Sequence, residues 1–134
     1  MTYVFDSSAL LAWLKDEPGA DTVDVALHDR DSVRLVHALN LAEVFYDQRR
    51  TGGEEFAQGA LELLGASGLQ AREDLDAALW QDAARIKADH RRISLADCCG
   101  LALARRAGGT FLTTDKHELD RDEVKALCPI QFIR

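Results

Sequence analysis

The sequence lacks any long hydrophobic run, and no segment approaches the ~18 consecutive apolar residues of a membrane-spanning helix. Its first residues include no basic stretch and carry an acid, Asp6, so we expect no signal peptide and a cytoplasmic protein. Cysteine is also scarce, with three residues, of which Cys98 and Cys99 are adjacent. Their odd number and spacing argue against a disulfide framework or a zinc site and favour a reducing compartment.

Basic residues are the minority, with 16 Lys and Arg against 23 Asp and Glu, which gives a net charge of −7. Nonspecific electrostatic binding of nucleic acid is therefore not expected. This balance does not exclude a nuclease that contacts phosphate through bound metal ions, because their charge is absent from the sequence count.

Linker-forming residues are few as well, with two prolines, scattered glycines and no internal repeat. The chain has 134 residues, of which 47% are hydrophobic and 29% charged, as is ordinary for a folded domain. We therefore expect one domain over residues 1–134.

Short apolar runs with β-branched or aromatic residues predict strands. They lie at 2–5, 33–36, 110–113 and 130–133, with a weaker one at 69–71. Helical spacing predicts helices around 10–14, 20–29, 41–45, 54–66, 75–86 and 94–106. Because helices rather than tight turns separate the strands, we expect an α/β fold with a mostly parallel sheet of four to five strands and helices on both faces.

Four carboxylates occur in segments that are otherwise almost free of charge: Asp6, Glu43, Asp97 and Asp115. Asp6 is the only charged residue among the first fourteen, and Asp97 is alone in a helix so apolar that it should be buried. A carboxylate in apolar surroundings must be hydrogen-bonded, protonated or bound to a metal ion, because its desolvation is costly.

Taken singly, each acid is better explained as a structural residue. Asp6 fits a helix N-cap and Asp115 a turn. Capping boxes would pair Asn40 with Glu43 and Ser94 with Asp97.

Taken together, the acids favour a shared site. Asp6 and Asp115 follow strands directly, so both belong at the carboxyl edge of a parallel sheet. Glu43 and Asp97 stand early in helices that begin at that edge. Four carboxylates in one cleft would repel one another unless divalent cations compensate, and all-oxygen donors favour Mg²⁺ or Mn²⁺. Such a site suits phosphodiester hydrolysis.

The order and spacing of these motifs resemble a PIN domain, and specifically the VapC toxins of bacterial type II toxin-antitoxin modules. The matching pieces are YVFDSSALLAWL, NLAEVF, SLADCCGLALA and FLTTDKHEL, which span essentially the whole chain. The resemblance implies a metal-dependent ribonuclease directed at single-stranded RNA, with Asp6, Glu43, Asp97 and Asp115 as site acids and Thr113 as the accompanying hydroxyl. It also implies a homodimer held inactive by a VapB-type antitoxin.

On this reading we expect Asp6, Asp97 and Asp115 to hold one Mg²⁺ or Mn²⁺ ion directly, with Glu43 as a further ligand or as the base that orients the attacking water. Thr113 would fix a carboxylate or a water by hydrogen bonding.

Basic residues near the motifs have two interpretations. Arg91, Arg92 and Lys116 could line an RNA groove, although basic residues at helix ends commonly complement the helix dipole. His117 could contact phosphate. Trp13 and Trp80 could stack on bases, but their helical spacing favours core or interface positions.

Other functions remain open at this point. An aspartyl-phosphate phosphatase needs an acid two residues after Asp6, where this chain has Ser8, and a receiver domain needs an acidic pair. A PIN nuclease of RNA processing or decay without an antitoxin, and a noncatalytic PIN-like binding module, are the remaining alternatives. The RNA target is not predictable from one chain.

Overall fold

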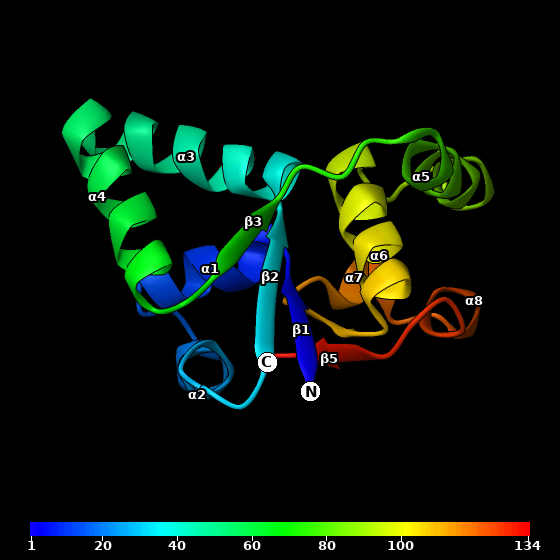
Figure 1. Ribbon diagram of the computed structural model, residues 1–134, viewed down its shortest axis with the longest axis horizontal. Helices are drawn as coiled ribbons and strands as arrows, with labels where there is room; N and C mark the ends of the chain where they lie inside the picture. The colour runs from blue at the N-terminus through cyan, green and yellow to red at the C-terminus, as the bar shows by residue number, and fades with distance from the viewer.

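A computed structural model describes residues 1–134, and its five strands form one sheet in the order β3-β2-β1-β4-β5 (Figure 1). All pairings are parallel, and Phe5 on the central strand lies opposite Val36 on one side and Leu112 on the other. The predicted α/β class with a parallel sheet is therefore confirmed. No helix combines the length and the apolar character that crossing a bilayer requires.

Two helices lie between each strand and the next along the chain. Their bounds are β1 (Thr2–Phe5), α1 (Ser7–Leu14), α2 (Ala20–Leu27), β2 (Val33–His37), α3 (Ala38–Gly52), α4 (Glu54–Ala66), β3 (Gln70–Arg72), α5 (Ala77–Asp89), α6 (Leu95–Ala107), β4 (Thr110–Thr113), α7 (Lys116–Leu119), α8 (Asp122–Lys125) and β5 (Ile130–Phe132).

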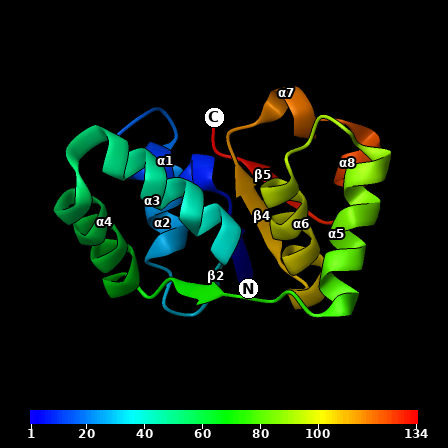
Figure 2. The same cartoon turned by 90° about the horizontal axis from the view of Figure 1, so that it is seen from above.

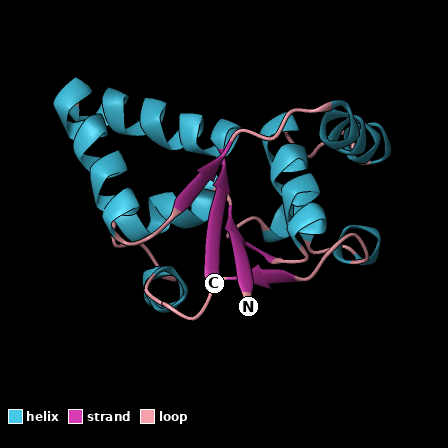
Figure 3. Cartoon of the chain, in the orientation of Figure 1, coloured by secondary structure: helices cyan, strands magenta, loops and turns pink.

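Two hydrophobic cores lie on opposite faces of the sheet, because successive strand side chains point to opposite sides. On one face, strand residues such as Val4 and Phe111 pack with α5 and α6. On the other, Phe5 and Leu112 pack with α1, α2 and α4. Figure 3 shows helices flanking the strands on both sides. The three-layer architecture expected from the sequence is thus confirmed.

The carboxyl ends of the strands bring several element ends together. Only Asp6 separates the end of β1 from the start of α1, and no residue separates β2 from α3. Seen from above, the first turns of α1, α3 and α6 surround the middle of the sheet, and the segment leading into α7 closes the remaining side (Figure 2). This edge is where a site built from residues that follow strands can form.

The structure corrects two expectations on α5. Leu75 lies outside the helix, and its side chain is 52% exposed. The helix begins at Ala77, and the carboxylates of Asp74 and Asp76 in the segment before it are both bound by the guanidinium of Arg106. Trp80 is 51% exposed, so of its two expected places the core is wrong and an interface stays a prediction. The neighbouring residue Leu79 takes the inward position on this helix.

Candidate active site

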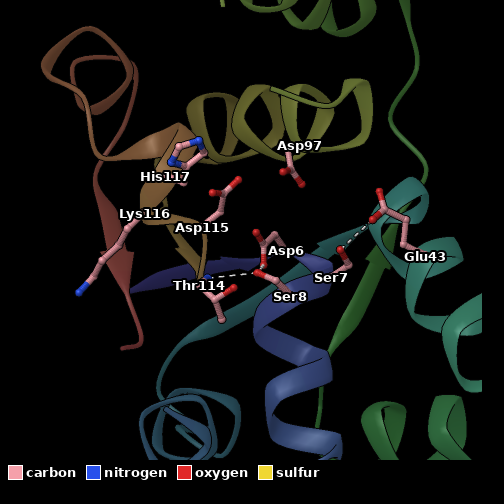
Figure 4. A pocket seen from close by; sticks show the side chains of 9 residues that line it. All are labelled: Asp6, Ser7, Ser8, Glu43, Asp97, Thr114, Asp115, Lys116 and His117. Atoms are coloured by element: carbon pink, nitrogen blue, oxygen red, sulfur yellow. Dashed lines mark hydrogen bonds between the residues drawn. The ribbon is translucent and has the colours of Figure 1, made fainter. Parts of the chain in front are cut away.

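A polar cavity of about 510 Å³ opens at the carboxyl edge of the sheet, and no hydrophobic residue lines it (Figure 4). Its lining residues come from α1 with the residue before it, α3, α6, and the β4–α7 segment. They are Asp6, Ser7, Ser8, Glu43, Asp97, Thr114, Asp115, Lys116 and His117. The structure therefore brings the four sequence-predicted carboxylates to one cavity.

Asp6 is the most buried of these acids, with 1% of its surface exposed. Because it is the N-cap of α1, its Oδ1 accepts a hydrogen bond from the Ala9 amide at 2.9 Å and from the Ser8 hydroxyl at 2.6 Å. Its Oδ2 accepts from the Thr113 hydroxyl at 2.5 Å. Burial raises the pKa of Asp6 to about 6, although these hydrogen bonds oppose the shift. The capping interpretation is thus right for Asp6, and the same carboxylate also faces the cavity.

The segment that carries Asp115 is tied to Asp6 through two hydroxyls. The Thr113 oxygen accepts from the Asp115 amide at 3.0 Å, and the Ser8 oxygen accepts from the Thr114 amide at 3.1 Å. Asp115 in turn caps α7 by accepting from the Glu118 amide at 3.0 Å. Asp6 and Asp115 are therefore held by one hydrogen-bonded unit.

Asp97 stands in the first turn of α6, directly before a run of buried residues. Ser94 caps this helix, and its hydroxyl accepts from the Asp97 amide at 3.1 Å, which is the Ser94 half of the predicted capping box. Desolvation, with repulsion from Asp6, Glu43 and Asp115, raises the pKa of Asp97 to about 8. An acid shifted this far is typical of functional clefts.

Glu43 lies across the cavity from the other acids. The Ser7 hydroxyl donates to its Oε2 at 3.0 Å, as the dashed line in Figure 4 marks. The predicted capping box of Asn40 and Glu43 is wrong, because His37 is the N-cap of α3 and its Nδ1 accepts from the Leu39 amide at 3.2 Å. Asn40 is fully buried inside the first turn instead.

The basic residues divide into two groups. Lys116 and His117 line the cavity and are exposed, and the Lys116 side chain extends away from the acids, as Figure 4 shows. Arg91 and Arg92 are exposed in the loop before α6 but do not line the cavity.

Sequence reasoning did not assign roles to three further polar residues. Ser7 and Ser8 contact the carboxylates of Glu43 and Asp6, and Asn40 lies beneath them. Hydroxyls within two residues of an isolated acid were the available signal for the two serines. For Asn40 the sequence offered only the capping-box spacing.

The carboxylate oxygens that line the cavity are the type of donor that binds a hard divalent cation. Figure 4 shows Asp6, Asp97 and Asp115 extending toward a shared space. No three His, Cys, Asp or Glu side chains are yet near enough to one another to ligate an ion together. Mg²⁺ commonly keeps several waters and uses only one or two carboxylates directly, so the open arrangement suits a hydrated ion. Desolvation and repulsion from the other acids raise the pKa of Asp97, and the positive charge of a bound cation would offset that repulsion.

Known proteins share the family and the fold of this chain. A family model of the PIN domain matches residues 3–123. At the level of sequence alone, no curated protein matches the chain.

Among solved structures, VapBC2 from Rickettsia felis, bound to a DNA fragment from its promoter, has a chain with a TM-score of 0.77 at 15% identity, covering 98% of both chains. VapBC-1 from nontypeable Haemophilus influenzae gives a TM-score of 0.74 at 15% identity over 99% of this chain and 98% of that one. VapC20 from Mycobacterium tuberculosis, a Sarcin-Ricin loop cleaving toxin, gives 0.66 at 18% identity over 87% and 92%. At these identities the likeness shows a shared fold.

Proposed function

The chain belongs to the PIN-domain family, and from that premise we propose that it is a metal-dependent endoribonuclease of the VapC toxin type. The observation that carries the proposal is the meeting of four carboxylates, from four separate segments, in one polar cavity. The raised pKa values of Asp6 and Asp97 add to it, because strongly shifted acids mark functional clefts.

Asp6, Asp97 and Asp115 are the residues that would hold a hydrated Mg²⁺ or Mn²⁺ ion, directly or through its waters, with Glu43 at the edge of the same site. A divalent ion bound there would polarise the scissile phosphate and lower the pKa of a water molecule. The chain's own contribution is to fix the carboxylates. Ser8 and Thr113 orient Asp6 from both sides, which leaves its charge directed at the cavity.

Glu43 is the residue best placed to accept a proton from the attacking water. Its Oε2 is held by the Ser7 hydroxyl, which leaves the other carboxylate oxygen without a partner within the protein. Lys116, exposed at the rim, would contact a substrate phosphate. Attack by water rather than by the ribose 2′-hydroxyl leaves a 3′-hydroxyl and a 5′-phosphate, so 2′,3′-cyclic phosphate products would contradict this mechanism.

The proposed partners are an RNA substrate, a VapB-type antitoxin and a second copy of the chain, in the cytoplasm. The support for the antitoxin is that similar folds were solved as VapBC complexes from Rickettsia felis and Haemophilus influenzae. Cleavage of RNA without any effect on growth would favour an RNA-processing or decay nuclease instead.

The test is cleavage of total and structured RNA by the purified chain, freed of any bound partner. We expect cleavage with Mg²⁺ or Mn²⁺, none with EDTA, and a loss of at least about 100-fold in Asp97→Asn, because this acid lies among the others. Asp82→Asn is a matched control, since Asp82 lies on α5 outside the cavity and pairs with Arg105. Equal cleavage by wild type and Asp97→Asn would refute the assignment.

A further inference from the structure

A single buried amide joins the three helices that border the acidic cavity. Asn40, in the first turn of α3, has no exposed surface. Its Oδ1 accepts a hydrogen bond from the Ser7 amide at 3.3 Å, and its Nδ2 donates to the Ala96 carbonyl at 3.0 Å. Ser7 and Ala96 are 33 and 56 residues away in sequence, so these bonds connect α3 with α1 and α6.

The partners of this amide are the immediate neighbours of the site acids. Ser7 directly follows Asp6, and Ala96 directly precedes Asp97. Asn40 itself stands three residues before Glu43, which places the two on the same side of α3 about one turn apart. One side chain therefore connects the backbone segments that carry these three acids.

We infer that Asn40 is a positioning residue for the acidic cavity: its amide sets the separation of Asp6, Glu43 and Asp97 without touching their carboxylates. This role rests on the proposed function. The amide is suited to it because it offers one acceptor and one donor in fixed directions, and both are used. An apolar side chain of the same size could fill the space, but it would leave the Ser7 amide without a partner and would remove the link to the Ala96 carbonyl.

The neighbourhood is shaped to admit this amide. A Cβ placed at Gly100, on the face of α6 toward α3, would come within 2.9 Å of the Asn40 Nδ2 and within 2.7 Å of the Phe111 ring. The glycine thus lets α6 approach α3 closely enough for the bond to Ala96. A second link, from the Ser7 hydroxyl to Glu43, supports the same arrangement from the α1 side.

The experiment compares Asn40→Leu and Asn40→Asp with wild type by Mn²⁺ binding in calorimetry and by RNA cleavage. Asn40→Asp keeps the acceptor for Ser7 and replaces the donor to Ala96 with a carboxyl group, which also adds a charge near the site acids, so the two variants test the bridge without and with an added charge. We expect Mn²⁺ affinity to fall about 10-fold or more and kcat to fall about 10- to 100-fold, with KM within about two-fold, since groups that orient metal ligands have effects of this size.

Val23→Ala is the matched control for simple loss of stability, because Val23 is fully buried on α2 and outside the cavity. Thermal unfolding is measured on all variants. Full Mn²⁺ affinity and kcat in both Asn40 variants would overturn the positioning role, as would losses no larger than those of Val23→Ala at an equal drop in Tm. A wild-type chain that neither binds Mn²⁺ nor cleaves RNA would instead overturn the proposed function and this role with it.

Discussion

Ser8 and Thr113 each use one hydroxyl oxygen twice, as donor to Asp6 and as acceptor from a backbone amide of the β4–α7 segment. A hydroxyl has a single proton, so giving it to the carboxylate leaves only the lone pairs for the amide. Both hydroxyls therefore favour the ionised form of Asp6. Their hydrogen bonds counteract the burial that raises the pKa of this acid.

At this scale the first prediction is for Thr113→Val. The valine has nearly the same shape but cannot donate to Asp6 or accept from the Asp115 amide. We expect the pKa of Asp6 to rise above about 6, because a hydrogen bond that lowers it is lost. Since cleavage needs the ionised carboxylate, kcat/KM should fall about 10- to 100-fold, and the loss should be larger at pH 6 than at pH 8.

The measurement is the pH profile of kcat/KM, with Thr113→Ser as the control that keeps the hydroxyl. The buried amide left without a partner should also lower the free energy of unfolding in urea by about 1–3 kcal/mol. Identical pH profiles for the valine and serine variants would show that the hydroxyl does not support Asp6.

At the scale of elements, helix α6 packs closely against two neighbours, and Gly100 makes both contacts possible. It must pack against β4 and also approach α3, and every residue from Cys98 to Ala104 is buried. Burial raises the pKa of the Cys98 thiol to about 12, which keeps it in the unreactive thiol form. Burial also raises the pKa of the Cys99 thiol, so the two adjacent cysteines act as small core residues.

The second prediction concerns Gly100→Ala on this helix. Alanine is intrinsically the better helix former by about 1 kcal/mol, but the added methyl would meet the Phe111 ring and the Asn40 amide. Because overpacking typically costs about 1–3 kcal/mol, we expect a net loss of about 1 kcal/mol. Gly59→Ala on α4 is the matched control, since no atom lies within 4 Å of its added Cβ. Urea unfolding should show stabilisation for Gly59→Ala; stabilisation of both variants would contradict the close packing.

The sequence predicted well those helices and strands whose apolar residues recur at a regular spacing or whose ends are marked by turn or capping residues. The apolar runs at 2–5 and 110–113 have the bounds of β1 and β4, and the weak run at 69–71 lies within one residue of β3. The four-residue helices α7 and α8 were not predicted, because about one turn is too short to display a helical repeat.

The residues of the site also differ in how far the local sequence predicts them. The acids were predictable because each stands out as a charge in an apolar segment and follows a strand or begins a helix. The contacts of Asn40 were not, because a polar residue early in a helix is ordinary and its partners lie 33 and 56 residues away. Only the fold reveals that pairing.

At the scale of the whole molecule, the pKa values of two acids in the cavity and of two acids outside it are shifted in opposite directions. Hydrogen bonds from Arg72 and Arg106 lower the pKa of Asp74 to about 2, and Arg106 likewise lowers that of Asp76. In contrast, burial raises the pKa of Asp6 to about 6, and burial with repulsion raises that of Asp97 to about 8. Above about pH 6 the lowered acids are ionised in both the folded and the unfolded chain, so they no longer contribute to the pH dependence of stability there, whereas Asp97 still does.

The last prediction follows from the sign of those shifts. Between pH 4 and 8 the folded chain holds protons on Asp6 and Asp97 that the unfolded chain has released, so stability falls as pH rises. The contribution is complete below about pH 4, and it is lost through pH 6 for Asp6 and through pH 8 for Asp97. Without divalent ions, Asp97→Asn should therefore melt above wild type at pH 9 and close to it at pH 5, because asparagine carries no charge to repel the other acids.

Saturating Mn²⁺ should reverse this slope in the wild type, since binding requires ionised carboxylates and stabilises only the folded chain. The Mn²⁺-induced rise in Tm should be larger at pH 8 than at pH 5, and it should shrink in Asp97→Asn. Thermal unfolding followed by circular dichroism, with and without EDTA, measures both effects. A wild-type Tm that does not change with Mn²⁺ at either pH would mean that the four carboxylates line one cavity but bind no ion there. Their mutual repulsion would then have to be offset by something other than a divalent cation.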